Sequence, residues 1–142
     1  MRKTKTFIGL TILFSLIALA AACGGSSGSQ KQIIKAAPIG NNLTVALSSD
    51  TDKLKSGEQE LTLAFTDASG KAVDVGAASL GFHMPAMGSM AAMNNAATLT
   101  TTGTPGVYRG KVNIQMPGEW QAQIAFEGAA GKGKTSFPVT VQ

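Results

Sequence analysis

The 142-residue sequence contains one cysteine, one histidine, one tryptophan and one tyrosine, and only 14% of its residues are charged. A single cysteine excludes an internal disulfide, so a folded domain must be held together by its apolar core. The low charge and the 44% of hydrophobic residues also exclude a chain that is disordered throughout. At this length we expect one domain of ordinary size.

The basic residues are too few and too scattered to hold a nucleic acid. Arg2, Lys3 and Lys5 are three of the 12 Lys and Arg residues, and the other nine nearly balance the eight Asp and Glu residues. The sequence has no Ser/His/acid nucleophile motif, no pair of carboxylates placed to flank a cleft and no phosphate-binding glycine loop. Because its one histidine has no nucleophile or orienting partner in the sequence, we predict a protein that is not an enzyme.

The first 22 residues predict a secretory signal peptide. A basic start, MRKTK, precedes an apolar run from Phe7 to Ala22 that only Gly9, Thr11 and Ser15 interrupt. The run is shorter than the roughly 20 residues that a transmembrane helix needs, and a Gly/Ser stretch follows it. We therefore expect an exported protein with a cleaved signal rather than a permanent membrane span.

The sole cysteine, Cys23, directly follows this apolar run. The sequence LAAAC at residues 19–23 resembles the bacterial lipoprotein signal, in which the cysteine becomes the lipid-modified N-terminus. It departs from that pattern at Ala20, where Leu is favoured, so ordinary cleavage with a free thiol stays open. The resemblance implies a lipid anchor on Cys23 in the cell membrane or an outer membrane, with the protein facing the periplasm or the cell exterior. Residues 23–40, in which a Gly/Ser stretch follows Cys23, are expected to form a flexible tether.

Residues 41–142 show the alternation of apolar and polar side chains that is typical of strands with one buried face. Turn signals such as DASGK at residues 67–71 separate the runs, and no segment shows helical periodicity. Seven short antiparallel strands in about 100 residues predict an all-β, immunoglobulin-like sandwich. The seven runs are centred on Leu43–Leu47, Leu61–Phe65, Val73–Phe82, Thr98–Thr102, Tyr108–Ile114, Trp120–Phe126 and Phe137–Val141.

The most unusual stretch is FHMPAMGSMAAM, residues 82–93, which contains the only histidine and four of the six methionines. Pro85, Gly88 and the Asn94–Asn95 pair interrupt it, so we expect a loop rather than a helix with its methionines on one buried stripe. Thioether sulfur and imidazole nitrogen are ligand types that suit Cu(I). The sequence therefore predicts a copper site formed by His83, Met84, Met87 and Met90, with Met93 and Met116 as further candidate ligands.

A second interpretation of the same stretch stays open. Methionine is a flexible apolar side chain, so the loop would also suit a hydrophobic contact surface on a structural or protein-interaction domain. Alternating strand directions place the connections at residues 49–58, 83–95 and 115–118 at one end of the sandwich, which brings Met116 to the end that carries the methionine loop. For the copper interpretation, the expected partner is a protein that donates or accepts copper, and we expect the domain itself to be monomeric.

Three motifs, in this order, resemble the YtkA-like domain family, which is related to FixH-type proteins. They are AFTDASGKAVDV at residues 64–75, FHMPAMGSM at 82–90 and GVYRGKVNIQMPGEWQAQIAF at 106–126. The resemblance covers about Glu60 to Val141 and implies an immunoglobulin-like fold with a role in copper handling or cytochrome oxidase assembly. Many relatives carry a histidine just after the MPxMG segment, where this chain has Ser89-Met90. The chain also resembles, in part, periplasmic copper chaperones, but it lacks their second histidine.

Overall fold

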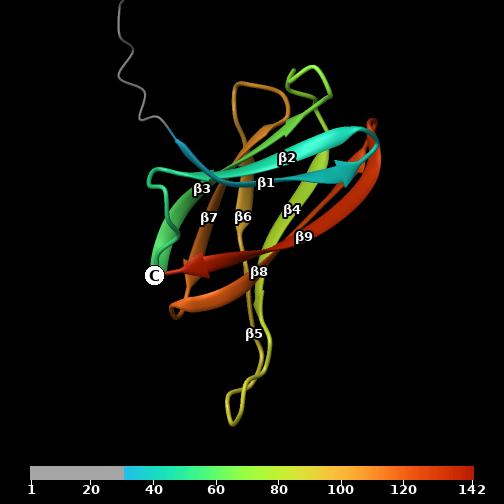
Figure 1. Cartoon of the computed structure of the whole chain (residues 1–142). Helices are drawn as coiled ribbons and strands as arrows, with labels where there is room; N and C mark the ends of the chain where they lie inside the picture. Colours follow the sequence, from blue (N-terminus) through green and yellow to red (C-terminus); the bar gives the residue numbers. More distant parts are fainter. Residues whose placement is uncertain (1–30) are drawn as a thin grey trace, which may run out of the picture.

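The computed structural model describes residues 31–142, which form a two-layered β-sandwich without a helix (Figure 1). One sheet has the strand order β1-β2-β3-β7-β6 and the other has the order β5-β4-β8-β9. All strand pairs within the two sheets are antiparallel, so the predicted all-β sandwich is confirmed. The strands are β1 Gln32–Gly40, β2 Leu43–Ser49, β3 Gly57–Thr66, β4 Ala77–Met84, β5 Met93–Ala96, β6 Thr98–Thr101, β7 Val107–Ile114, β8 Gly118–Gly128 and β9 Gly131–Val141.

The structure has nine strands where the sequence predicted about seven. The seven predicted runs correspond to β2, β3, β4, β6, β7, β8 and β9, and the additional strands are β1 and β5. The run that was expected to start at Val73 starts later, because Ala72 makes only an isolated bridge to Thr66 and β4 begins at Ala77. No helix in this part of the chain is long and apolar enough to span a membrane.

Strand β1 lies in the segment that the sequence analysis assigned to the tether. It pairs with β2 through a two-residue turn, in which Asn41 and Asn42 have φ angles of 52° and 57°. Positive φ at both positions is the requirement of a type I′ hairpin turn, which asparagine tolerates. Ile39 at the end of β1 is buried in the core. The predicted boundary at residue 41 is therefore too late, while the signal peptide, Cys23 and the start of the tether lie outside the described residues.

The core lies between the sheets and is formed mainly by the alternating residues of the predicted runs, together with Ile39, Leu54 and Met84. Trp120, Phe65 and Phe82 are among its largest fully buried side chains. Phe65 packs edge-on against Tyr108, with a distance of 5.7 Å between the ring centroids. The Tyr108 hydroxyl donates a 2.7 Å hydrogen bond to the carbonyl of Gly76, which ties β7 to the segment before β4. Burial of these faces is the main stabilising term of the domain.

Three connections meet at one end of the sandwich. Gly57 pairs with Ile114 across β3 and β7, and Gly118 pairs with Val141 across β8 and β9. Met84, the last residue of β4, lies at the same end of the sandwich. Its methyl carbon is 3.0 Å from the position that a Cβ on Gly118 would take. Alternating strand directions thus correctly predicted that the connections at residues 49–58, 83–95 and 115–118 emerge at one end of the sandwich.

The chain passes from one sheet to the other directly after the methionine-rich segment. Strand β5 is an edge of the four-stranded sheet, β6 is an edge of the five-stranded sheet, and only Ala97 separates them. The Ala97 N–H donates a 2.9 Å hydrogen bond to the carbonyl of Leu80 on β4. The β4–β5 hairpin is therefore anchored at its base to both layers, while its far end projects beyond the sandwich (Figure 1).

Candidate metal site at the β4–β5 hairpin

The methionine-rich stretch forms a hairpin. Strands β4 and β5 pair from Gly81 with Ala96 up to Met84 with Met93, and an isolated bridge joins Met87 to Met90 nearer the tip. As predicted, the stretch does not form a helix. It was expected to be a loop, but strands β4 and β5 occupy both of its ends. Asn94 and Asn95, which the sequence analysis treated as interruptions, lie within β5.

Met87 and Met90 form the tip of this hairpin. The Met87 N–H donates to the Met90 carbonyl at 3.1 Å, and the Met90 N–H donates to the Met87 carbonyl at 2.9 Å. Gly88 between them has a φ of 55°, which fits a type II′ turn with glycine at its first central position. Side chains of directly opposed residues lie on the same side of a hairpin, with Cβ atoms about 4.5–5.5 Å apart.

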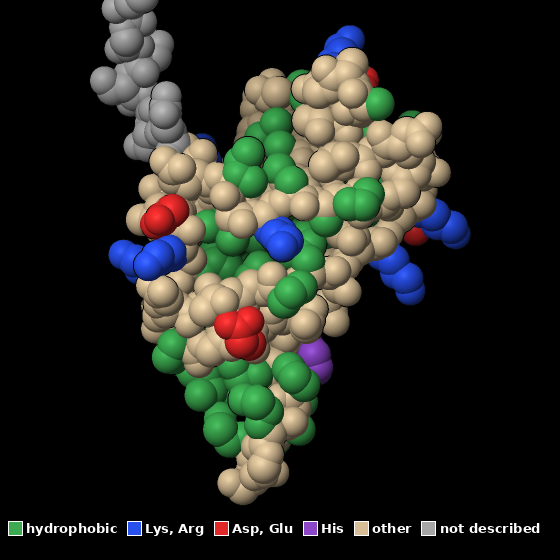
Figure 2. All heavy atoms as spheres, viewed as in Figure 1, with side chains coloured by type: hydrophobic (Ala, Val, Ile, Leu, Met, Phe, Trp, Pro, Cys, Tyr) green, Lys and Arg blue, Asp and Glu red, His purple; other side chains and the backbone are tan. Residues whose placement is uncertain are grey.

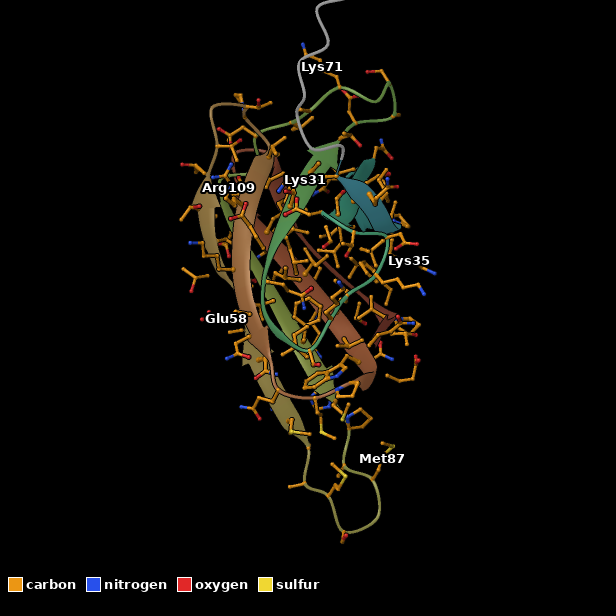
Figure 3. All side chains as sticks on the ribbon, turned by 90° about the vertical axis from the view of Figure 1, so that its left-hand side faces the viewer. Lys31, Lys35, Glu58, Lys71, Met87 and Arg109 are labelled. Carbon is orange, nitrogen blue, oxygen red and sulfur yellow. The ribbon has the colours of Figure 1, made fainter. Side chains whose placement is uncertain are left out.

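The two tip methionines are exposed. Met87 has 57% and Met90 has 42% of its surface accessible, and Met87 extends from the end of the hairpin in Figure 3. Two residues that face each other across the hairpin therefore carry thioether side chains that are exposed to solvent and do not contribute to the core. Hydrophobic side chains gather near the base of the hairpin on the face that Figure 2 shows. The hairpin carries no charged side chain, because the sequence has no Asp, Glu, Lys or Arg between Val75 and Tyr108.

The other three predicted sulfur ligands contribute to the core. Met84 is 2% exposed, and Met93, its partner across the hairpin, packs against the core from a half-buried position. Met116 reaches the predicted end of the sandwich but is half-buried against the core as well. Its carbonyl oxygen accepts a 3.1 Å hydrogen bond from Nε1 of Trp120.

His83 lies on the other face of β4 from Met84, because successive side chains of a strand point to opposite faces. Its Nδ1 is 2.7 Å from Oδ1 of Asn94, the residue opposite it on β5. Since an amide oxygen only accepts hydrogen bonds, the His83 ring donates this bond from Nδ1, and Nε2 is the ring nitrogen that the contact does not use. Metal-binding histidines commonly have this arrangement, in which the second ring nitrogen donates to an oxygen.

The six predicted ligands thus occupy three separate places. Met87 and Met90 lie together at the tip, Met84, Met93 and Met116 pack on the core side, and His83 lies on the outer face of the sheet. The expected cluster of His83 with Met84 is not formed, because the two residues belong to one strand and not to a loop.

Asn94 is the residue that the sequence analysis missed. It pairs with His83, and both residues lie five positions from the turn at Gly88–Ser89. Recognising Gly88–Ser89 as a two-residue hairpin turn would have identified this pair from the sequence.

Other ligand types are scarce at this end of the molecule. Within residues 31–142, no three His, Cys, Asp or Glu side chains lie close enough together to hold a metal ion. The sequence contains no Asp, Glu, Lys or Arg between Val75 and Tyr108. A groove of about 800 Å³ on the outer face of the four-stranded sheet, beside Gly81 and Gln123, is lined by none of the predicted ligands. A metal ion at the hairpin tip would depend on the methionine sulfurs.

Comparison with known protein families gives a match over residues 39–125 to the family described as YtkA-like. No curated protein matches the sequence. Among solved structures, a DUF4785 family protein from Legionella pneumophila subsp. pneumophila str. Philadelphia 1 is similar, with a TM-score of 0.49 and 12% sequence identity. The similarity covers 70% of this chain and 28% of that protein, so the present chain spans well under half of its length. The family match covers more than half of the chain, from the end of β1 into β8, and the protein belongs to the YtkA-like family.

Proposed function

We propose that the protein is an exported, lipid-anchored protein that binds Cu(I) through the sulfur atoms of Met87 and Met90. The observation that carries this proposal is the reciprocal backbone pairing of these two residues, which places two exposed thioether side chains on the same side of the hairpin. Exposed apolar side chains that are grouped on a soluble domain usually serve an interaction. Here the grouped atoms are soft donors, which favour Cu(I) over harder cations.

The chemistry of the tip supports Cu(I) rather than Ca²⁺, Mg²⁺ or Zn²⁺. Calcium and magnesium require oxygen ligands, and zinc sites are built mostly from cysteine, histidine and carboxylate side chains. The tip, residues 85–92, contains no carboxylate, cysteine or histidine. Neutral thioethers bind a monovalent soft cation without first releasing a proton.

The open arrangement of the tip fits delivery better than storage. A site with two protein ligands at the end of a projecting hairpin leaves the ion accessible, so the ligands of a partner can replace its own one at a time. The role we propose is copper handling at the cell envelope, for example supply to cytochrome oxidase assembly, with Cys23 carrying the lipid. The protein would exchange copper with a donor or acceptor protein and would catalyse no reaction itself.

One observation favours a second candidate function. Among residues 31–142, the exposed large hydrophobic side chains are Ile33, Met87 and Met90, and two of these three lie at the tip. A hydrophobic contact surface for a partner protein would use the same two side chains without a metal ion. The two functions differ in their response to a chelator, because only the copper site needs the ion.

Anaerobic titration of the purified protein with Cu(I), against a competing chelator, tests the proposed function. Replacing Met87 and Met90 together by Leu keeps the apolar volume and removes both sulfurs, so we expect binding to weaken by more than about tenfold with unchanged circular dichroism.

The matched control is the replacement of Met93 and Met116 together by Leu, which removes two sulfurs from the same end of the molecule but leaves the tip intact. We expect this variant to bind Cu(I) like the wild type. If the variant with Met87 and Met90 replaced by Leu bound Cu(I) as tightly as the wild type, copper would be held elsewhere in the protein.

A further inference from the structure

The tip supplies two sulfur ligands, and the described part of the chain offers no third ligand beside them. Met84 is buried in the core, and Met93 and Met116 pack against it. His83 lies on the outer face of the sheet, where Asn94 holds its ring. Two neutral thioethers leave a Cu(I) ion with free coordination positions that further soft ligands can occupy. An ion held by Met87 and Met90 therefore has open coordination positions that something outside this hairpin must fill.

A second copy of the same tip satisfies this requirement. The chain has no Asp, Glu, Lys or Arg between Val75 and Tyr108, so two hairpin tips can approach each other without repulsion between like charges. The hairpin also projects from the sandwich, so its end can meet another tip before the two sandwich bodies collide (Figure 1). The small, exposed Ala86 and Ala91 beside the methionines leave the sulfurs accessible.

We infer that Cu(I) joins two copies of this chain tip to tip, with Met87 and Met90 of each copy supplying four sulfur ligands to one ion. This inference rests on the proposed copper site, and it identifies a second copy of the chain as the source of the further ligands. A two-fold axis through the ion would relate the copies, which is the usual symmetry of a homodimer and uses the same surface twice. The pair would be a copper-bridged dimer in which each half keeps its own sandwich.

The size of the tip makes this dimer dependent on copper. Stable protein interfaces take about 20–30 residues from each partner. The tip comprises residues 85–92, which is far too small a surface to hold two chains together without the ion. The dimer should therefore appear at about one copper ion for two chains. It should dissociate when copper exceeds one ion per chain, because each tip then binds its own ion.

Sedimentation velocity of the purified protein under anaerobic conditions tests the inference, with Cu(I) varied from zero to two ions per chain. We expect the mass of one chain without copper, twice that mass near half an ion per chain, and the single-chain mass again at the highest ratio. Copper binding with a single-chain mass at every ratio would refute the dimer and leave the proposed function standing. No copper binding at all would refute both the dimer and the proposed function. A doubled mass without copper would show that an apolar contact joins the two copies, which would also refute the inference.

Three variants define the contact. Replacing Met87 and Met90 by Leu should abolish the copper-dependent doubling, whereas replacing Met93 and Met116 by Leu should leave it unchanged. Ser89→Lys places a charge on the exposed turn of each tip without removing a sulfur. We expect this variant to bind copper but to form at least about tenfold less dimer at low salt, with recovery at high salt. Normal dimerisation of Ser89→Lys would show that the tips do not face each other.

Discussion

Replacing Trp120 by alanine should destabilise the sandwich more than any other single truncation at the hairpin end. Trp120 is 1% exposed, and deleting a buried aromatic side chain of this size costs about 3–5 kcal/mol of unfolding free energy. The substitution also removes the hydrogen bond from Nε1 to the Met116 carbonyl, which adds about 1 kcal/mol. We therefore expect a loss of about 4–6 kcal/mol, a large share of the total stability of a small domain.

Two further variants separate packing from hydrogen bonding. Trp120→Phe keeps a buried ring but leaves the Met116 carbonyl without its donor, so we expect a loss of about 1–2 kcal/mol. Gln123 lies on the same strand but is exposed on the outer face, so Gln123→Ala should change the stability by no more than about 0.5 kcal/mol.

Urea unfolding followed by far-ultraviolet circular dichroism is the appropriate measurement. Trp120 is the only tryptophan, so its replacement removes the tryptophan fluorescence that would otherwise report unfolding. A Trp120→Ala variant within about 1 kcal/mol of the wild type would contradict the burial of Trp120 between the sheets.

Four other changes test separate parts of the molecule. Cys23→Ser should give protein without lipid that no longer partitions with membranes, and unchanged partition would refute the anchor. Ile39→Ala should cost about 2–5 kcal/mol in urea unfolding if β1 belongs to the core, whereas the same change in a tether would cost almost nothing. His83→Gln should leave the Cu(I) affinity unchanged in a chelator competition, and a clear loss would mean that the imidazole is a ligand. Hydrogen bonds, first from the Ser69 hydroxyl and next from the Lys71 N–H, lower the pKa of Asp67. The stability that Asp67 contributes over Asp67→Asn should therefore be present above its ordinary pKa of 3.8 and disappear in acid unfolding as the pH falls through the lowered value. A stability difference between the two proteins that does not change as the pH falls would contradict this.

The fold could be predicted from the sequence because most strands bury one face and expose the other. Leu61, Leu63 and Phe65 alternate with half-buried residues on β3, and Trp120 begins the same pattern on β8. Strand β1 escaped prediction because its alternation fails. Its register against β2 shifts between Ile33 and Lys35, and Ile39 is its only fully buried residue. An edge strand that buries so little has no clear periodicity to detect.

The candidate site was predictable in composition but not in arrangement. The concentration of soft ligands in residues 82–93 is visible in the sequence. Which of them meet depends on where the hairpin turns, since a shift by one residue would exchange the faces of His83 and Met84. The turn at Gly88–Ser89 is what pairs Met87 with Met90 and directs Met84 into the core. The Asn94–Asn95 pair was interpreted as an interruption typical of a loop, but both residues lie within strand β5.

The passage of the chain from β5 to β6 through Ala97 has a mechanical consequence. Two strands that belong to different layers hold the base of the hairpin, and the hydrogen bond from Ala97 to Leu80 fixes the corner. We expect a hairpin that is held in this way to move little relative to the sandwich. Its tip cannot turn toward a partner by itself, so the orientation of the whole domain determines which molecules the tip can reach.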